Sequence, residues 1–488
     1  RRVPLRCAGC GKVFYPGLPA EAKGEKYDET AKAIMALEKY RLGTGFNRLE
    51  DFQANLGVPL PAATQWDLLN ASAKDLAPVH EEHIRQAADA RLFHNDDTPN
   101  RILELKRHKP APEAGSACCK SAPQGPRTGT GVVAACEIAQ PAPSVKTAPV
   151  AQPTSTVQAQ LPPGGDPSAL RIDATPVRPT AAESPSADGL SPAVWASGTA
   201  RPPGKEQSAK APRDKKAKRT GQYTTAIVAV GALHRIALFF TGRKHAGENL
   251  DEVLLRRAEG LPRPQQMCDG LANNLPATFQ TLLGNCLAHG RRKFYDLFAY
   301  WPEECRYVLE ALAEVYGTDA RAKEARLSDE ERLLLHQAES EPVMERLKDW
   351  MVAQFAEKKV EPNSRLGKAI KYCQKRWERL TLFLRVPGAP LDNNLAERVL
   401  KTAIRHRRNS LFFKTPRGAA VGDLFMTLIH TCLLNGANPF DYLVVLLRHK
   451  ALLAASPADW MPWNYKQTMA GLALAPSLAV QKADDGTG

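Results

Sequence analysis

The sequence lacks a long uninterrupted apolar run. Its most apolar stretch, residues 224–240, is interrupted by His234 and Arg235, and the segments on either side of this pair are too short to cross a bilayer. The chain opens on RRVPLRCAGC, without an apolar leader, so we expect a protein that is neither exported nor held in a membrane. Residues 224–240 instead predict two buried strands.

Cysteine and acidic residues are also sparse. Ten cysteines are scattered over 488 residues, which excludes the dense disulfide framework of small secreted domains and favours a reducing compartment. Basic residues outnumber acidic ones, and the formal net charge is +14. This balance favours a polyanionic partner, because basic clusters gain affinity by displacing counterions from phosphates. Many basic proteins have no such partner, so the charge alone does not decide the matter.

One long segment has almost no aromatic residues. Between about residues 110 and 212 the chain is mostly Pro, Ala, Ser, Thr and Gly, with Trp195 as its single aromatic residue. Such a composition cannot bury enough apolar surface to offset its conformational entropy. Residues 106–219 are therefore predicted to be a disordered insertion.

Helices are predicted on the N-terminal side of this insertion. Residues 27–90 contain a helix, a short turn with Gly57 and Pro59, and a second helix. This outline fits a helix-turn-helix whose second helix, near residues 64–74, enters a DNA major groove. It also fits an ordinary helical hairpin, which is the commoner explanation of the shape alone.

An α/β core is predicted around the insertion. Strands are expected at 91–97, 222–230, 234–240, 265–269 and 285–289, with a helix at 246–260. This mixture predicts one open sheet. From about 300 to 386 the apolar residues recur at helix spacing, and Ser328 with Glu331 forms a capping box, which predicts a helical module set into the core.

Three acids occupy similar local positions: Asp96 and Asp269 end predicted strands, and Glu397 opens a predicted helix. Magnesium prefers oxygen ligands and keeps several waters, so two or three carboxylates at one sheet edge can hold it. Each acid also has a structural explanation. Asp96 fits an Asx-type cap, Asp269 a turn residue, and Glu397 a capping box begun by Asn394. Spacing alone therefore predicts no more than a metal-dependent phosphodiester enzyme.

Cationic residues accompany these acids. One group follows the strand expected at 285–289, and another shares one face of the helix that contains Glu397. Their members are His289, Arg291, Arg292, Lys293, Lys401, Arg405 and Arg408. Such side chains suit a phosphodiester substrate, because they orient phosphates while metal ions hold the reacting oxygens. His289 fits a buried structural role equally well.

Several stretches occur in a recognisable order: HNDDTP, GRKHAGENL, MCDG, NCLAHGRRKF, APLDNNLAERVLKTAIRHRRNSLFF and LIHTCLLNGANPFDYL. Together they resemble the insertion-sequence 66 family of DDE transposases. The resemblance covers nearly all of the chain except residues 106–219 and the C-terminal tail. It implies an α/β fold with a ribonuclease H-like catalytic core, interrupted by a helical insertion and preceded by a helix-turn-helix-like DNA-binding region. It also implies two magnesium ions, and cleavage and joining of DNA at the element's terminal inverted repeats.

The resemblance further implies roles for individual residues. Asp96, Asp269 and Glu397 match the three catalytic acids that bind Mg²⁺. Asp97 is the alternative to Asp96, since consecutive strand residues point to opposite faces and only one can serve. Family members also carry a zinc-binding segment with two cysteine pairs. Here Cys7 and Cys10 form one pair, so a zinc site is incomplete in this chain and two free thiols are the simpler expectation.

These features predict the following organisation. The segments are a partial zinc-binding-like segment (1–26), a helix-turn-helix-like region (27–90), the first core strand (91–105), the insertion (106–219), the core (220–298), the helical insertion (299–386), the C-terminal part of the core (387–455) and a tail (456–488). The long insertion departs from the family's short connection, but loop length adds little closure entropy, so the core can still assemble.

The expected partners are element-end DNA and target DNA, further copies of the chain assembled on DNA, and accessory proteins of the same element. The expected location is the bacterial cytoplasm, in association with the nucleoid. Two rival functions are a structure-selective nuclease on the same fold, and a catalytically inactive DNA-binding derivative.

Overall fold

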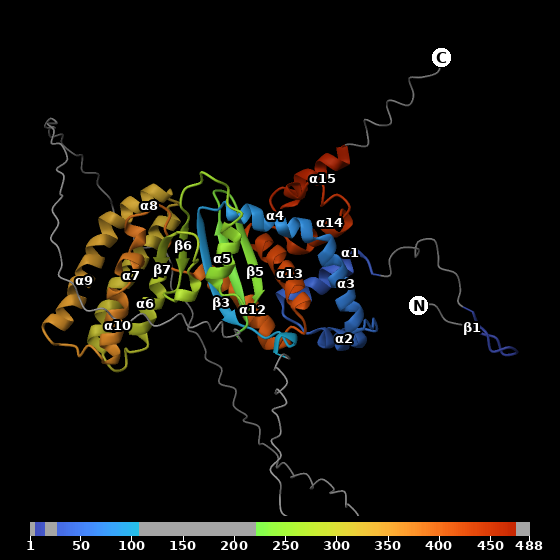
Figure 1. Ribbon diagram of the computed structural model, residues 1–488, viewed down its shortest axis with the longest axis horizontal. Helices are drawn as coiled ribbons and strands as arrows, with labels where there is room; N and C mark the ends of the chain where they lie inside the picture. Colours follow the sequence, from blue (N-terminus) through green and yellow to red (C-terminus); the bar gives the residue numbers. More distant parts are fainter. Residues whose placement is uncertain (1–4, 15–26, 107–220, 475–488) are drawn as a thin grey trace, which may run out of the picture. The chain divides into compact units, whose positions relative to one another are not determined.

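The computed structural model describes residues 5–14, 27–106 and 221–474. The insertion predicted at 106–219 therefore lies, apart from its first residue, outside the described residues, as does the end of the predicted tail. The described residues form a mixed α/β fold with one main sheet and many helices (Figure 1). No helix in these ranges combines the length and apolarity that crossing a membrane requires.

The main sheet has five strands in the order β5-β4-β3-β6-β7. They are β3 (Leu92–Pro99), β4 (Tyr223–Val230), β5 (Arg235–Gly242), β6 (Gln265–Cys268) and β7 (Leu282–Asn285). β4 pairs antiparallel with both β3 and β5, whereas β6 runs parallel to β3 and β7 runs parallel to β6. The strands predicted at 222–230 and 234–240 are confirmed and form a hairpin around Gly231. Strands that are remote in the sequence meet at β3.

Apolar side chains alternate between the two faces of this sheet. On one face, Ala226 and Val228 of β4 pack in a cluster with α12 (Asn394–Ser410) and α13 (Pro416–Leu434). On the other face, Ile227 and Ala229 pack with α4 (Ala77–Ala88) and α5 (Ala246–Leu254). This period of two is the reason that consecutive residues of one strand meet different helices.

Side chains of α13 accept hydrogen bonds from the backbone of the outer strand β5. The backbone N–H groups of Ala237 and Phe239 donate to the hydroxyls of Thr431 and Thr427, each at 3.2 Å, and Thr241 N–H donates to Asp423 Oδ2 at 2.7 Å. Four residues of helix rise about 6 Å and two residues of strand about 6.7 Å, so the two repeats nearly match. The helix thus occupies a strand edge that would otherwise be open to pairing.

Two predicted elements are placed differently by the structure. The strand predicted at 285–289 is wrong, because β7 ends at Asn285 and α6 (Leu287–Tyr295) begins two residues later. Residues 287, 290 and 294 are buried at helix spacing, which explains the assignment. The helix predicted at 246–260 ends at Leu254; beyond it, Arg257 donates to the carbonyl oxygens of Ala88 and Ala90 at 2.8 and 2.7 Å.

The N-terminal described residues are a short hairpin and a set of helices. The hairpin pairs β1 (Leu5–Arg6) with β2 (Val13–Phe14). The helices are α1 (Glu29–Ala36), the π-helical turn η2 (Leu37–Arg41), α2 (Phe46–Asn55) and α3 (Ala62–Asp75), followed by α4. Gly57, between α2 and α3, has φ +74°, a conformation that favours glycine. The predicted helix-turn-helix outline is therefore present, with α3 packed on α1 and α13.

A helical module follows α6 and has its own apolar cluster. Its helices are α7 (Pro302–Glu324), α8 (Asp329–Leu335), α9 (Glu341–Ala356), α10 (Arg365–Gln374) and α11 (Trp377–Leu380), with π-helical and 3₁₀ turns at His336–Ser340 and Leu382–Leu384. The predicted capping box is confirmed: Glu331 N–H donates to Ser328 Oγ at 3.2 Å, and Ser328 N–H to Glu331 Oε2 at 2.8 Å. The module contacts the sheet at β7.

After α13 the chain forms α14 (Pro439–Arg448), the 3₁₀ turn η7 (Pro457–Trp460) and α15 (Tyr465–Leu474). The break between α13 and α14 includes Gly436, whose φ is +69°. Tyr442 Oη donates to the carbonyl of Trp460 at 2.7 Å, which ties η7 to α14.

Candidate active site

The two consecutive acids of β3 lie on opposite faces of the sheet. Asp96 is paired with Ala226, which packs in the cluster of α12, so Asp96 faces α12. Asp97 Oδ2 faces α5, where it lies 2.9 Å from His245 Nδ1 and accepts from Ala246 N–H at 3.4 Å. Of the two acids, Asp96 is therefore the one on the face that α12 covers.

Asp269 lies directly after β6, the strand that runs parallel to β3. The pairing of the two strands ends with His94 opposite Met267, and Asp96 and Asp269 each lie two residues further along the chain. Asp269 Oδ1 accepts from Leu271 N–H at 2.9 Å and from Asn274 Nδ2 at 2.6 Å. The predicted turn role of Asp269 is therefore present, in a loop that also places its carboxylate beside β3.

The position of Glu397 is set by Asn393, the residue before α12. Asn393 Nδ2 donates to the carbonyl of Asn95 at 3.1 Å, and its Oδ1 lies 3.2 Å from His94 Nδ1. Its backbone N–H donates to Cys286 Sγ at 3.2 Å. These contacts join the start of α12 to β3 and to the β7–α6 connection, one turn before Glu397.

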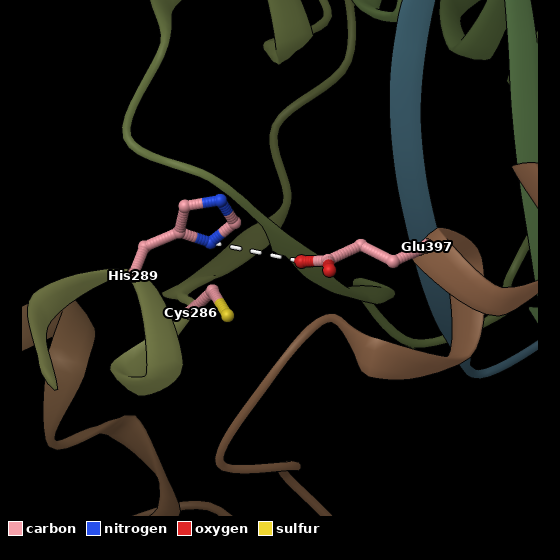
Figure 2. Close-up of side chains that lie close together, drawn as sticks. All are labelled: Cys286, His289 and Glu397. Atoms are coloured by element: carbon pink, nitrogen blue, oxygen red, sulfur yellow. Dashed lines mark ion pairs between the residues drawn. The ribbon is translucent and has the colours of Figure 1, made fainter. Parts of the chain in front are cut away.

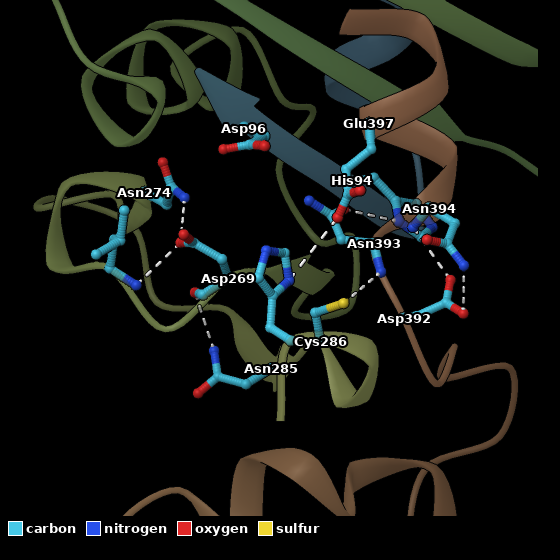
Figure 3. Close-up of polar contacts among 12 residues, drawn as sticks. His94, Asp96, Asp269, Asn274, Asn285, Cys286, Asp392, Asn393, Asn394 and Glu397 are labelled. Atoms are coloured by element: carbon cyan, nitrogen blue, oxygen red, sulfur yellow. Dashed lines mark hydrogen bonds and ion pairs between the residues drawn. The ribbon is translucent and has the colours of Figure 1, made fainter. Parts of the chain in front are cut away.

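The capping box predicted for Asn394 and Glu397 is wrong. Asn394 is the first residue of α12, after the N-cap Asn393, and its side chain donates to Asp392 Oδ2 at 2.7 Å. A capping box needs the acid three residues after the N-cap, and Glu397 is four residues after it. In Figure 3 the carboxylates of Asp96, Asp269 and Glu397 lie around one region, beside the end of β3.

The electrostatics of Asp96 reflect this arrangement. Burial, followed by the negative charges of Asp269, Asp97 and Glu397, raises the pKa of Asp96 to about 7, although the Asp97 N–H hydrogen bond opposes the rise. Carboxylates that raise one another's pKa repel one another when they are ionised. A bound cation offsets this repulsion and stabilises the ionised forms. The three carboxylates therefore favour the binding of a cation between them.

His289 is the predicted cationic residue nearest to these acids. Its Nδ1 lies 3.8 Å from Glu397 Oε1. The other predicted cations are exposed: Arg291, Arg292 and Lys293 lie on α6, and Lys401, Arg405 and Arg408 lie along α12. Arg405 Nη1 donates to the carbonyl of Arg41 at 3.4 Å, and Arg292 pairs with Asp296 at 3.8 Å. Both helices thus present basic side chains at the surface.

Sequence reasoning missed three residues that shape the site. The first is Asn393, which joins the start of α12 to β3 and to Cys286. Cys286 lies three residues before His289, and side chains at this spacing share one face of a helix. The prediction of a strand at NCLAH hid this signal. Arg376 Nη2 donates to the carbonyl of Gly270 at 3.1 Å, and its guanidinium lies 4.2 Å from the ring centre of Tyr372. No local pattern identifies Arg376, because α10 and α11 bring it to the Asp269 loop.

The predicted partial zinc segment contains Cys7 and Cys10 in the turn between β1 and β2. Both are exposed free thiols, and the backbone N–H groups of Cys10 and Gly9 lower the pKa of Cys7. Two free thiols stay the simpler expectation from the sequence, with an incomplete zinc site as the alternative.

The fold and the site define a mixed α/β protein with an acidic cluster where adjacent parallel strands end. The family model described as "Transposase IS66 family" matches residues 25–114 and 206–421, which is more than half of the chain. The protein belongs to the IS66 transposase family, and the resemblance seen in the sequence is confirmed.

Curated relatives come from Sinorhizobium fredii (strain NBRC 101917 / NGR234). "Uncharacterized protein y4jD" is 31% identical over 197 residues, covering 39% of this chain and 37% of the relative. "Uncharacterized protein y4hP" is 31% identical over 207 residues, covering 39% and 36%. The chain thus spans less than two fifths of the length of these relatives. No solved structure matches the chain.

Proposed function

We propose that this transposase is a DDE-type enzyme whose catalytic acids are Asp96, Asp269 and Glu397. The observation that carries the proposal is the coupling of the three: Asp269 and Glu397 both raise the pKa of the half-buried Asp96. Ionisable groups perturbed by burial and by specific charged partners are concentrated at functional sites. The positions of Asp96 on β3 and of Asp269 directly after the parallel strand β6, with Glu397 one turn into α12, support the same assignment.

The donor set fits magnesium. All three side chains are carboxylates, the hard oxygen ligands that Mg²⁺ binds while it keeps several waters. Among the residues that the structure describes, these acids do not form a group with all donor atoms within 4.8 Å. A wider spacing suits a pair of ions, which lie about 3.5 to 4 Å apart in two-metal sites. When bound, such ions activate the attacking oxygen, a water or a DNA 3′-hydroxyl, and stabilise the leaving oxygen.

The protein's own contribution is to position these ligands. β3 and the β6 end fix the spacing of Asp96 and Asp269, and Asn393 fixes the start of the Glu397 helix against both β3 and Cys286. We further propose that the sheet is a ribonuclease H-like core. The support is its topology, in which three antiparallel strands are followed by two strands parallel to the first.

DNA is the proposed substrate, and the terminal inverted repeats of the element are the proposed binding sites. The exposed cations of α6 and α12 lie on the helices that carry His289 and Glu397, and they suit phosphate contacts. α3 is the proposed recognition helix of the helix-turn-helix. The remaining proposals are assembly of several copies on paired DNA ends, help from accessory proteins of the element, and action at the bacterial nucleoid.

The test supplies pre-cleaved end DNA and a target plasmid with Mg²⁺. A transposase gives joined product, and Asp96→Asn, Asp269→Asn and Glu397→Gln each abolish it while end-DNA binding persists. The matched control is Asp97→Asn, which changes the adjacent acid on the opposite face and is expected to retain joining. Cleavage without joining indicates the nuclease alternative, and DNA binding with no magnesium-dependent chemistry indicates the inactive derivative.

A further inference from the structure

Three side chains of different chemistry meet beside the acid cluster. Cys286 Sγ, a ring nitrogen of His289 and a carboxylate oxygen of Glu397 all lie within 4.8 Å of one another. Cys286 directly precedes α6, His289 lies in its first turn, and Glu397 comes from α12. Figure 2 shows His289 and Glu397 reaching toward each other across a gap, with Cys286 beside it. Thiol, imidazole and carboxylate together are a ligand set of Zn²⁺, whereas Mg²⁺ takes oxygen ligands.

The spacing of the imidazole and the carboxylate suits a shared ion. His289 Nδ1 and Glu397 Oε1 are 3.8 Å apart, which is too long for a hydrogen bond. His289 Nδ1 is a buried atom that makes no hydrogen bond. Two ligand atoms that are each about 2.0 to 2.1 Å from one tetrahedral ion are about 3.4 Å apart. An ion between the two side chains therefore requires only a small approach.

The sulfur of Cys286 already has the surroundings of a metal ligand. Asn393 N–H donates to Sγ at 3.2 Å. Burial raises the pKa of this thiol to about 11, while the backbone N–H groups of Asn393 and His289 oppose the rise. Hydrogen bonds of this kind orient metal-binding side chains, and the N-terminus of α6 also favours negative charge.

We propose that Cys286, His289 and Glu397 bind one zinc ion, with the fourth position open to water. The open position follows from the exposure of the side chains, which is 38% for His289 and 37% for Glu397. Binding releases the thiol proton of Cys286 to solvent. Because the site takes Glu397 away from the proposed magnesium cluster, zinc is an inhibitor of the transposase. Zinc binding depends on these three ligands, whereas the inhibition rests on the proposed function.

The binding test uses the full-length reduced protein in a Cys7→Ser, Cys10→Ser background, so that the N-terminal pair cannot contribute. Co²⁺ is titrated as a spectroscopic substitute and is then displaced by Zn²⁺. The expected result is a thiolate-to-cobalt charge-transfer band, which Cys286→Ala removes. His289→Gln is expected to lower Zn²⁺ affinity by at least about 10-fold, as loss of a metal-site partner typically does. Cys432→Ala, which changes another buried free thiol, is the matched control and retains the band.

A second measurement separates zinc binding from catalysis. Asp269→Asn is expected to abolish magnesium-dependent cleavage and to keep the cobalt band. In the parent, Zn²⁺ is expected to stop cleavage in the presence of excess Mg²⁺, and His289→Gln to need at least about 10-fold more Zn²⁺ for the same fractional loss. Absence of the band, or a band that survives Cys286→Ala, overturns the site. Zinc bound at this site while cleavage continues unchanged overturns the inhibition, and absence of cleavage without zinc counts against the proposed function.

Discussion

Replacement of Asp96 by Asn is expected to stabilise the metal-free protein while abolishing its chemistry. The pKa of Asp96 rises from its ordinary value of 3.8 to about 7, with burial as the largest cause. The folded state therefore holds the Asp96 proton more tightly than the unfolded state does. The contribution of Asp96 to stability is greatest below pH 4, falls as the pH rises from about 4 to about 7, and is constant above that range.

The magnitude follows from the same pKa difference. One pKa unit corresponds to about 1.4 kcal/mol. The rise from 3.8 to about 7 therefore means that ionised Asp96 lowers the free energy of unfolding by at most about 4 kcal/mol. Asn has nearly the same shape and no charge, so it removes this cost. We expect Asp96→Asn to raise the free energy of unfolding by about 1 to 4 kcal/mol at pH 8, and by less than about half of that gain at pH 5.

The assay is urea unfolding at pH 5 and pH 8, in chelator and then in Mg²⁺. Bound Mg²⁺ stabilises the folded state by mass action, so the wild-type protein should gain stability with Mg²⁺ concentration and the variant should gain little. Asp97→Asn serves as the control for an acid on the opposite face. A variant that is no more stable than wild type at pH 8 without metal, or whose gain is equal at both pH values, refutes the reasoning.

Three further predictions concern the parts that position the site and bind DNA. Asn393→Ala should reduce joining by at least about 10-fold and cost about 2 to 4 kcal/mol in urea unfolding, because its two side-chain contacts with His94 and Asn95 of β3 are lost; unchanged joining contradicts the positioning role. Thr427→Val should cost about 1 to 3 kcal/mol, since Phe239 N–H loses its acceptor, whereas Thr427→Ser should cost less. Lys401→Ala should weaken end-DNA binding and reduce the slope of affinity against salt by about 1, whereas Lys348→Ala, at an exposed position on α9, should not; equal slopes would contradict the proposed DNA-binding face.

Local sequence patterns predicted much of the fold. The apolar runs of β4 and β5 and the Ser328 capping box depend on neighbours within a few residues, and both are present. The boundary between β7 and α6 was misplaced because NCLAH contains residues that suit either state. The burial of residues 287, 290 and 294, which decides for helix, comes from packing against the helical module.

The candidate site was predicted less completely than the fold. Each acid could be selected from its local setting and from the family resemblance, and the opposite facing of Asp96 and Asp97 follows from strand geometry. The contacts of the Asn393 side chain with β3 could not be predicted, since its partners His94 and Asn95 are about three hundred residues away in sequence. The same holds for Arg376, whose contact with the Asp269 loop depends on the tertiary placement of α10 and α11.

The central claim is that Asp96, Asp269 and Glu397 hold divalent ions together. The most direct measurement is anomalous diffraction from crystals of the protein soaked in Mn²⁺, a substitute for Mg²⁺ with a usable anomalous signal. The account predicts manganese peaks in contact with Asp96 and shared with Asp269 and Glu397, and predicts their loss in Asp96→Asn. Peaks confined to other parts of the molecule, with these three carboxylates uncoordinated, would contradict it.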